Sequence, residues 1–117
     1  MGDSAKDSCR LVVIGVGTRR KSIPLRREVV VGRSEACDLL LDHPSVSREH
    51  ARFFLRNDRC FVEDLDSHNG IRVNDEPTRW RELQSGDRVE IGPCQIVLRG
   101  RPASSGLLGK LLGLFRR

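Results

Sequence analysis

The chain has 117 residues, of which 38% are hydrophobic and 32% charged, and its formal net charge is +5. These fractions exclude an intrinsically disordered chain, and the length is enough for one domain with one hydrophobic core. The charge surplus lies in residues 99–117, while residues 1–98 hold as many acidic as basic side chains, which argues against a nucleic-acid partner for the body of the protein.

Short runs rich in Val, Ile and Phe, the composition that strands prefer, recur through the first hundred residues. In chain order the predicted strands are RLVVIGV (10–16), REVVVG (27–32), DLLLD (38–42), HARFFLR (50–56), CFVEDL (60–65), IRVN (71–74), DRVEIG (87–92) and CQIVLR (94–99). The segments between them, GTRRKSIP, HPS, RND, DSHNG, NDEP and QSGD, have the composition of turns. Many short strands at this spacing predict an all-β sandwich or barrel.

The predicted domain occupies residues 9–100, after a flexible N-terminus at 1–8 and before a linker, RPASSG, at 101–106. Residues 107–117 form a short amphipathic, basic tail. On a helical projection its apolar side chains share one arc of about 160°, opposite the cations, and they are Leu107, Leu108, Leu111, Leu112, Leu114 and Phe115. Such a tail can bind an anionic membrane surface, an apolar groove on a partner, or its own sandwich. The linker's reach and the basic charge favour one of the two intermolecular surfaces.

No apolar run approaches the roughly 18 residues of a membrane-spanning helix, and the first residues, MGDSAKDSC, lack the apolar segment of a secretion signal. We therefore expect a cytoplasmic protein, peripheral to a membrane only if the tail binds one. The cysteines at positions 9, 37, 60 and 94 form no C-x-x-C pair and have no zinc-ligand spacing from a histidine. We expect reduced thiols, with neither a metal nor another cofactor.

Three polar clusters fall where predicted strands begin or end: Gly32 and Arg33; Ser47, Arg48 and His50; and Ser67, His68, Asn69 and Gly70. The loops of a sandwich gather at its two ends, where binding residues are commonly found. If the three loops share one end, they assemble guanidiniums, hydroxyls, an amide and an imidazole. This set donates hydrogen bonds and carries positive charge, which suits a phosphate group.

Together with two later segments, these clusters resemble the forkhead-associated (FHA) domain, a family of phosphothreonine-peptide binding modules. The family pattern is Gly-Arg, Ser-x-x-His, Asn-Gly, an Asn-containing turn, and Gly-Asp-x-x-x-(Ile/Leu)-Gly. The matching residues are Gly32-Arg33, Ser47 to His50, Asn69-Gly70, Asn74, and Gly86-Asp87 through Ile91-Gly92. The resemblance covers roughly residues 10–100 and implies a β-sandwich of two mainly antiparallel sheets, similar to the FHA and SMAD folds.

The resemblance implies a site for a phosphothreonine-containing protein modified by a Ser/Thr kinase. The residues expected to contact the phosphopeptide are Arg33, Ser47, Arg48, Ser67, His68 and Asn69. Arg33 and Ser47 match phosphate contacts, and Asn69 matches the residue that bonds the peptide backbone. The residues expected to support the site are Gly32, His50, Gly70 and Ile71. His50 is expected to hold Ser47 rather than to touch the ligand, and Ile71 stands where the family usually has Thr.

Ser47 and His50 could suggest a catalytic nucleophile and its base, but an enzyme would also need an accompanying catalytic motif. The sequence contains no G-x-S-x-G nucleophile turn, no P-loop and no H-E-x-x-H motif, so we predict a non-catalytic binding module. Each polar residue alone has a structural explanation, such as a hairpin turn for Asn69-Gly70, and the functional prediction depends on their co-occurrence. The alternative is a structural or docking protein that acts mainly through its basic amphipathic tail, with a degenerate phosphothreonine site.

Overall fold

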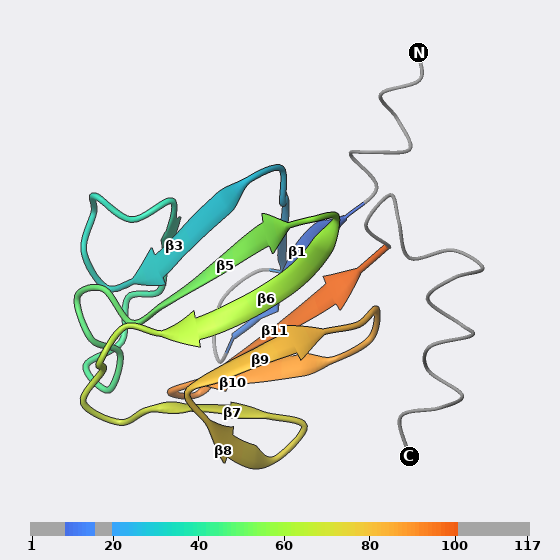
Figure 1. The fold of residues 1–117 in the computed structure, drawn as a ribbon. Helices are drawn as coiled ribbons and strands as arrows, with labels where there is room; N and C mark the ends of the chain where they lie inside the picture. Colours follow the sequence, from blue (N-terminus) through green and yellow to red (C-terminus); the bar gives the residue numbers. More distant parts are fainter. Residues whose placement is uncertain (1–8, 16–19, 101–117) are drawn as a thin grey trace.

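The computed structural model describes residues 9–15 and 20–100, and Figure 1 shows their fold. Within these ranges the chain forms strands and no helix, and the strands form two sheets that enclose one core. The predicted all-β sandwich is therefore confirmed. The flexible N-terminus predicted at 1–8, the linker at 101–106 and the tail at 107–117 lie outside the described residues.

Each sheet combines strands that are far apart in the sequence. The six-stranded sheet contains, in spatial order, β2 (Lys21–Pro24), β1 (Arg10–Ile14), β11 (Cys94–Arg99), β10 (Arg88–Ile91), β7 (Ile71–Val73) and β8 (Glu76–Thr78). The five-stranded sheet contains β4 (Leu39–Leu40), β3 (Glu28–Gly32), β5 (Ala51–Arg56), β6 (Arg59–Asp64) and β9 (Trp80–Leu83). Among these described strands the pairs are antiparallel, except that β3 and β4 run parallel.

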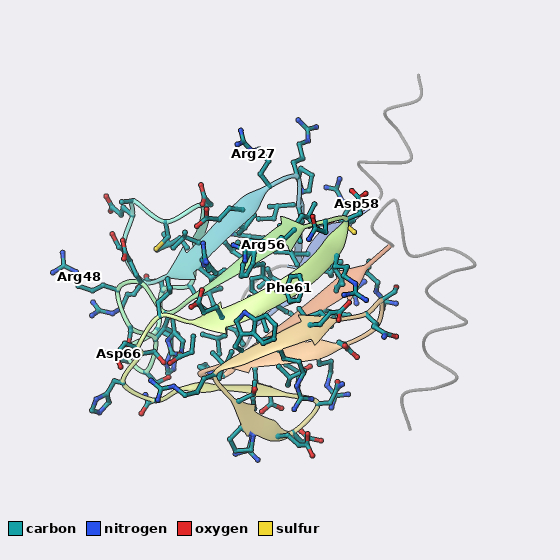
Figure 2. All side chains as sticks on the ribbon, viewed as in Figure 1. Arg27, Arg48, Arg56, Asp58, Phe61 and Asp66 are labelled. Carbon is teal, nitrogen blue, oxygen red and sulfur yellow. The ribbon has the colours of Figure 1, made fainter. Side chains whose placement is uncertain are left out.

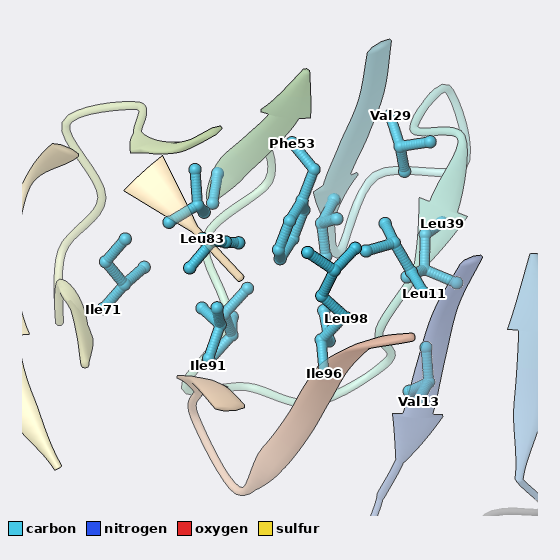
Figure 3. Close-up of a cluster of buried hydrophobic side chains, with 14 of the residues drawn as sticks. Leu11, Val13, Val29, Leu39, Phe53, Ile71, Leu83, Ile91, Ile96 and Leu98 are labelled. Atoms are coloured by element: carbon cyan, nitrogen blue, oxygen red, sulfur yellow. The ribbon is translucent and has the colours of Figure 1, made fainter. Parts of the chain in front are cut away.

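The hydrophobic core lies between the sheets because alternate side chains of each strand point inward. Leu11 and Val13 of β1 are buried from one sheet, and Phe53 of β5 is fully buried from the other. Figure 3 shows the ring of Phe53 extending toward Leu98 of the opposite sheet. Burial of one such side chain stabilises the fold by about 1.5–3 kcal/mol, so these positions fix the two layers and with them the loops at each end.

The structure contains three strands that the sequence patterns did not predict: β2, β8 and β9. β2 lies within the predicted turn GTRRKSIP, at the edge of its sheet, where Pro24 breaks no central ladder. The predicted turn NDEP is a two-residue hairpin turn, because Asn74 and Asp75 have φ values of 50° and 74° and join β7 to β8. The residues after that turn form β8 and then β9 instead of continuing as a loop.

The strand directions bring the three polar clusters to one end of the sandwich. β3 and β6 end there and β5 begins there, because Val31 pairs with Ala51 and Ala51 pairs with Asp64. β7 begins at the same end, and the loops concerned lie at the left in Figure 1. The Asn74 and Asp87 parts of the sequence pattern lie at the opposite end, where Asn74 Nδ2 donates to Asp87 Oδ1 (3.0 Å). These two residues therefore stabilise the fold away from the three clusters.

Candidate functional site

Gly32 ends β3 at a point where the chain passes close to the loop between β4 and β5. The backbone N–H of Arg33 donates to Ser47 O (2.9 Å), and that of Ser34 donates to Arg48 O (3.1 Å). A Cβ atom on Gly32 would stand only 2.1 Å from the Arg48 carbonyl oxygen. Only glycine permits this approach without displacing the loop, so Gly32 sets the distance between Arg33 and the Ser47 loop.

Two arginines, Arg33 and Arg48, lie on the two sides of this backbone contact. Arg33 Nε donates to Val46 O (3.0 Å), which orients the guanidinium group and leaves its terminal N–H groups for a ligand. Arg48 is exposed and projects from the end of its loop, as Figure 2 shows. Both arginines line one open hollow together with Ser34 and Glu35. Paired guanidiniums of this kind can hold an anion with several oxygens through charge-assisted, bidentate hydrogen bonds.

Ser47 is held from two sides by the protein itself. Its backbone N–H donates to His50 Nδ1 (3.0 Å), and its Oγ accepts a hydrogen bond from the backbone N–H of His68 (2.9 Å). A hydroxyl that already accepts this bond keeps its own proton for another acceptor. The Ser47 hydroxyl is therefore free to donate to an oxygen acceptor outside the protein. His68 supports it through its backbone, while the His68 side chain is exposed at the loop surface.

His50 is the one polar or charged residue in the described core, and both of its ring nitrogens are bonded. Nδ1 accepts the Ser47 N–H, and Nε2 lies 2.7 Å from the carbonyl oxygen of Gly70, which can only accept. These two partners require the neutral tautomer with the proton on Nε2. His50 therefore connects the β4–β5 loop to the β6–β7 loop from inside the core.

The β6–β7 loop is shaped by a local turn around Ser67. Its Oγ donates to Asp64 Oδ1 and accepts the backbone N–H of Gly70 (2.8 Å). Because its only hydroxyl proton is bonded to Asp64, Ser67 has no donor left for a phosphate, and we assign it to support of the turn. Gly70 adopts φ 77°, a conformation that favours glycine, and the chain then enters β7 at Ile71, which is 2% exposed.

Asn69 joins the same two loops at the surface. Its Nδ2 donates to Ser45 O (2.9 Å), which leaves its Oδ1 and one amide hydrogen for a further partner. A side-chain amide with one free donor and one free acceptor matches the hydrogen-bonding groups of a peptide backbone. A second open hollow begins beside Asn69 and extends along β7 and β8, where its lining includes Arg72, Pro77, Thr78 and Arg79.

The sequence patterns did not single out several residues that shape these loops. His43 Nδ1 lies 2.7 Å from Ser45 Oγ, and a Cβ on Gly92 would stand 2.8 Å from that same hydroxyl. The spacing of Asp64 and Ser67 is a recognised local turn signal and could have revealed that pair. The approach of Gly92 to Ser45 joins residues distant in sequence, so no local pattern could have revealed it.

Cys37 lies beside the loop of Arg48 as a protonated thiol. Its Sγ donates to the Arg48 carbonyl oxygen (3.1 Å). Burial raises the pKa of the Cys37 thiol, and a hydrogen bond with the Ser34 backbone opposes part of this increase. The Glu49 and Asp38 carboxylates add a smaller contribution that raises the pKa. The thiol therefore keeps the proton that this hydrogen bond requires.

The family model of the FHA domain matches residues 29–92, which is more than half of the chain. A curated relative, the oxoglutarate dehydrogenase inhibitor of Corynebacterium efficiens, is 40% identical over 73 residues, which are 62% of this chain and 51% of that protein. The chain spans about half the length of the curated relatives it matches. None of the residues that the structure describes forms a helix with the length and hydropathy that crossing a bilayer requires.

Two solved structures are similar over most of this chain. One comes from a structural and functional study of phosphothreonine-dependent FHA domain interactions; it is 26% identical, with a TM-score of 0.71, and the match covers 81% of this chain and 98% of that one. The other is Mycobacterium tuberculosis EmbR in complex with a low-affinity phosphopeptide; it is 26% identical, with a TM-score of 0.75, and the match covers 91% of this chain and 28% of that one.

Proposed function

Because the chain belongs to the FHA domain family, we propose that it binds phosphothreonine-containing proteins modified by a Ser/Thr kinase, as a non-catalytic adaptor. The phosphothreonine-dependent and phosphopeptide-bound relatives support this proposal. The residues that match the family pattern include Arg33, Ser47 and Asn69, whose side chains keep unused hydrogen-bond donors. A ligand would contact these side chains.

The observation that carries the proposal is the arrangement around Ser47. Its hydroxyl oxygen is fixed by His68 N–H (2.9 Å), which frees the hydroxyl proton for a ligand. The guanidiniums of Arg33 and Arg48 line the adjacent hollow. A phosphate carries a charge of about −1.5 to −2 at neutral pH and has three acceptor oxygens. The two guanidiniums supply the opposite charge, and together with the Ser47 hydroxyl they supply hydrogen-bond donors for those oxygens.

The peptide chain that carries the phosphate would pass Asn69. The free Oδ1 and amide hydrogen of Asn69 can bond one peptide N–H and one peptide C=O, which would fix the position of the phosphothreonine relative to its neighbours. The hollow beside Asn69 would then take the flanking residues. We propose that an apolar surface near Ile71 accepts the threonine methyl group, so that phosphothreonine binds better than phosphoserine.

Calorimetric titration with a phosphothreonine peptide library tests the proposal. The best peptide should bind with micromolar-order affinity, about −8 kcal/mol. Arg33→Ala removes a charge-assisted contact and should cost about 2 kcal/mol or more, roughly 30-fold in affinity. Ser47→Ala should also weaken binding, because it removes the hydroxyl proton.

Arg99→Ala is the matched control for Arg33→Ala. It removes the same charge from an exposed arginine at the end of β11, the opposite end of the sandwich from Arg33. Arg99→Ala should keep the wild-type affinity, and the unphosphorylated peptide should not bind. If Arg33→Ala and Ser47→Ala both bind the best peptide as well as wild type does, the proposed site is wrong. Equal affinity for matched phosphoserine and phosphothreonine peptides would rule out the proposed contact with the threonine methyl group and leave the phosphate site untouched.

A further inference from the structure

Three aromatic rings lie in a row on the outer face of the five-stranded sheet, the face turned away from the core. Phe54 of β5 stacks on Phe61 of β6 with ring centroids 5.5 Å apart, and Phe61 stacks on Trp80 of β9 at 5.1 Å. Figure 2 shows Phe61 in the middle of this face. We call Phe54, Phe61 and Trp80 the aromatic ladder. None of these rings takes part in the proposed phosphothreonine site.

The aromatic ladder is covered at one end and open at the other. The guanidinium of Arg52 lies 4.3 Å from the centroid of the Phe54 ring, and that of Arg56 lies 5.5 Å from it. Trp80 at the other end is 56% exposed, the highest value among the large hydrophobic side chains that the structure describes. A tryptophan at the open end of a stack of three rings offers a rigid apolar contact surface of the kind that binding partners use.

The described chain ends close to this surface. Gly86 N donates to Leu98 O (2.7 Å), so the end of β11 lies beside the connection between β9 and β10. β9 itself ends at Leu83, which pairs with Cys60 near the β5–β6 hairpin. Residues 101–106 can span up to about 20 Å, whereas packed sheets lie about 10 Å apart. Residue 107 can therefore reach the outer face of the five-stranded sheet at its hairpin end.

Residues 107–117 have the size and the apolar surface that fit the aromatic ladder. As a helix they would be about 17 Å long, enough to cross three strands spaced about 5 Å apart. Their leucines and Phe115 would share one side of that helix, and Lys110 and the two terminal arginines would lie on the other. The apolar side can cover the rings while the cations stay in water.

The charges around the aromatic ladder neither attract nor repel a basic helix strongly. Arg52 Nε lies 2.7 Å from Glu63 Oε1, and Arg59 Nε lies 3.3 Å from Glu82 Oε2, so these groups neutralise one another. An anionic partner surface would gain little on this face, and the contact that remains is apolar. The sequence alone favoured an intermolecular surface over the protein's own sandwich for the tail, but it could not show that the sandwich carries an aromatic face within the reach of the linker.

We propose that residues 107–117 bind, as an amphipathic helix, to the aromatic ladder of their own chain and cover Trp80. The site and its occupant are separate from the phosphothreonine site, so this inference stands or falls independently of the proposed function. Tethering by a short linker also favours the same chain, because it gives the tail a high effective concentration at the ladder.

Trp80 is the only tryptophan of the chain, so its fluorescence reports on the aromatic ladder alone. In the full chain we expect emission at shorter wavelength and weaker quenching by acrylamide than in Leu111→Glu, which places a carboxylate in the apolar side of the tail. Lys110→Gln changes the net charge by the same single unit on the opposite side, and it should leave the emission and quenching at their wild-type values. Both substitutions lie outside the sandwich core, so the domain remains folded.

Protection of Trp80 that is lost in Leu111→Glu and does not change with protein concentration would support the proposal. Protection that fades on dilution would overturn it, because the tail of a second copy would then be the occupant. Identical emission in wild type and Leu111→Glu would also overturn it. The same holds if Trp80 is fully accessible in wild type and the tail binds only added anionic vesicles, since the tail would then be a membrane-binding segment.

Discussion

Replacing His50 with alanine should weaken both the fold and the proposed phosphothreonine site, because this buried side chain joins two loops. His50 is 0% exposed, and its ring bonds Ser47 N–H (3.0 Å) and the Gly70 carbonyl (2.7 Å). Its loss leaves each backbone group without a partner, at about 1–3 kcal/mol apiece, and opens a cavity that water fills only in part. We expect a loss of about 4 kcal/mol, a large share of the 5–15 kcal/mol that stabilises a typical domain.

Urea unfolding followed by circular dichroism measures the loss of stability, and calorimetric titration under conditions where the variant is folded measures the affinity. We expect the affinity to fall about tenfold, because Ser47 and the loop of Asn69 lose their common support. Asn74→Ala is the control, since it removes the bond to Asp87 (3.0 Å) at the opposite end and should cost stability without affinity. The reasoning is refuted if His50→Ala unfolds within about 1 kcal/mol of wild type, or if it loses stability but binds as tightly as Asn74→Ala does.

Gly32→Ala should lower the stability by about 1–3 kcal/mol and also weaken phosphopeptide binding, because its Cβ would stand 2.1 Å from the Arg48 carbonyl oxygen; an unchanged urea midpoint would show that the loop yields freely. Burial raises the pKa of the Cys60 thiol to about 12, with a smaller contribution from Cys9. In the unfolded chain the thiol ionises at about pH 8.5. The stabilisation that comes from keeping Cys60 protonated in the folded state is therefore complete below that pH. It is lost as the pH rises toward 12, by at most about 1.4 kcal/mol per pH unit. Urea titrations between about pH 8 and pH 10 should show a shallower decline for Cys60→Ala, and equal slopes would contradict this account.

The sandwich could be predicted because its central strands carry their inward residues at every second position. β1 and β5 follow this pattern with Leu11, Val13 and Phe53. β2, β8 and β9 could not be predicted in this way, because they are short edge or near-edge strands with mixed polar residues. Their pairing depends on hairpin geometry, such as the positive φ values of Asn74 and Asp75, more than on hydrophobic pattern.

The sequence motifs predicted that three polar loops would share one end of the sandwich, and the fold brings Arg33, Ser47 and Asn69 together there. That these residues bind a phosphopeptide stays a prediction. The partner of each hydrogen bond could not be predicted, because residues 47 and 68 are 21 positions apart and the pairing of β5 with β6 lies between them. Ser67 illustrates this limit. Its residue type suits a phosphate contact, yet its hydroxyl proton bonds Asp64 three positions earlier, and only the geometry distinguishes the two uses.

The pairing of β1 with β11 sets the order in which the fold can be completed during synthesis. β1 and β2 join the rest of their sheet only through β11, in a register that places Arg10 opposite Arg99. The five-stranded sheet draws only on residues 28–83, so a nascent chain can contain all of its strands while the opposite layer is still incomplete. During that interval Phe53 has no complete layer to pack against, and its apolar surface is exposed. Closure of the sheet depends on long-range contacts that become available only after β11 has been synthesised.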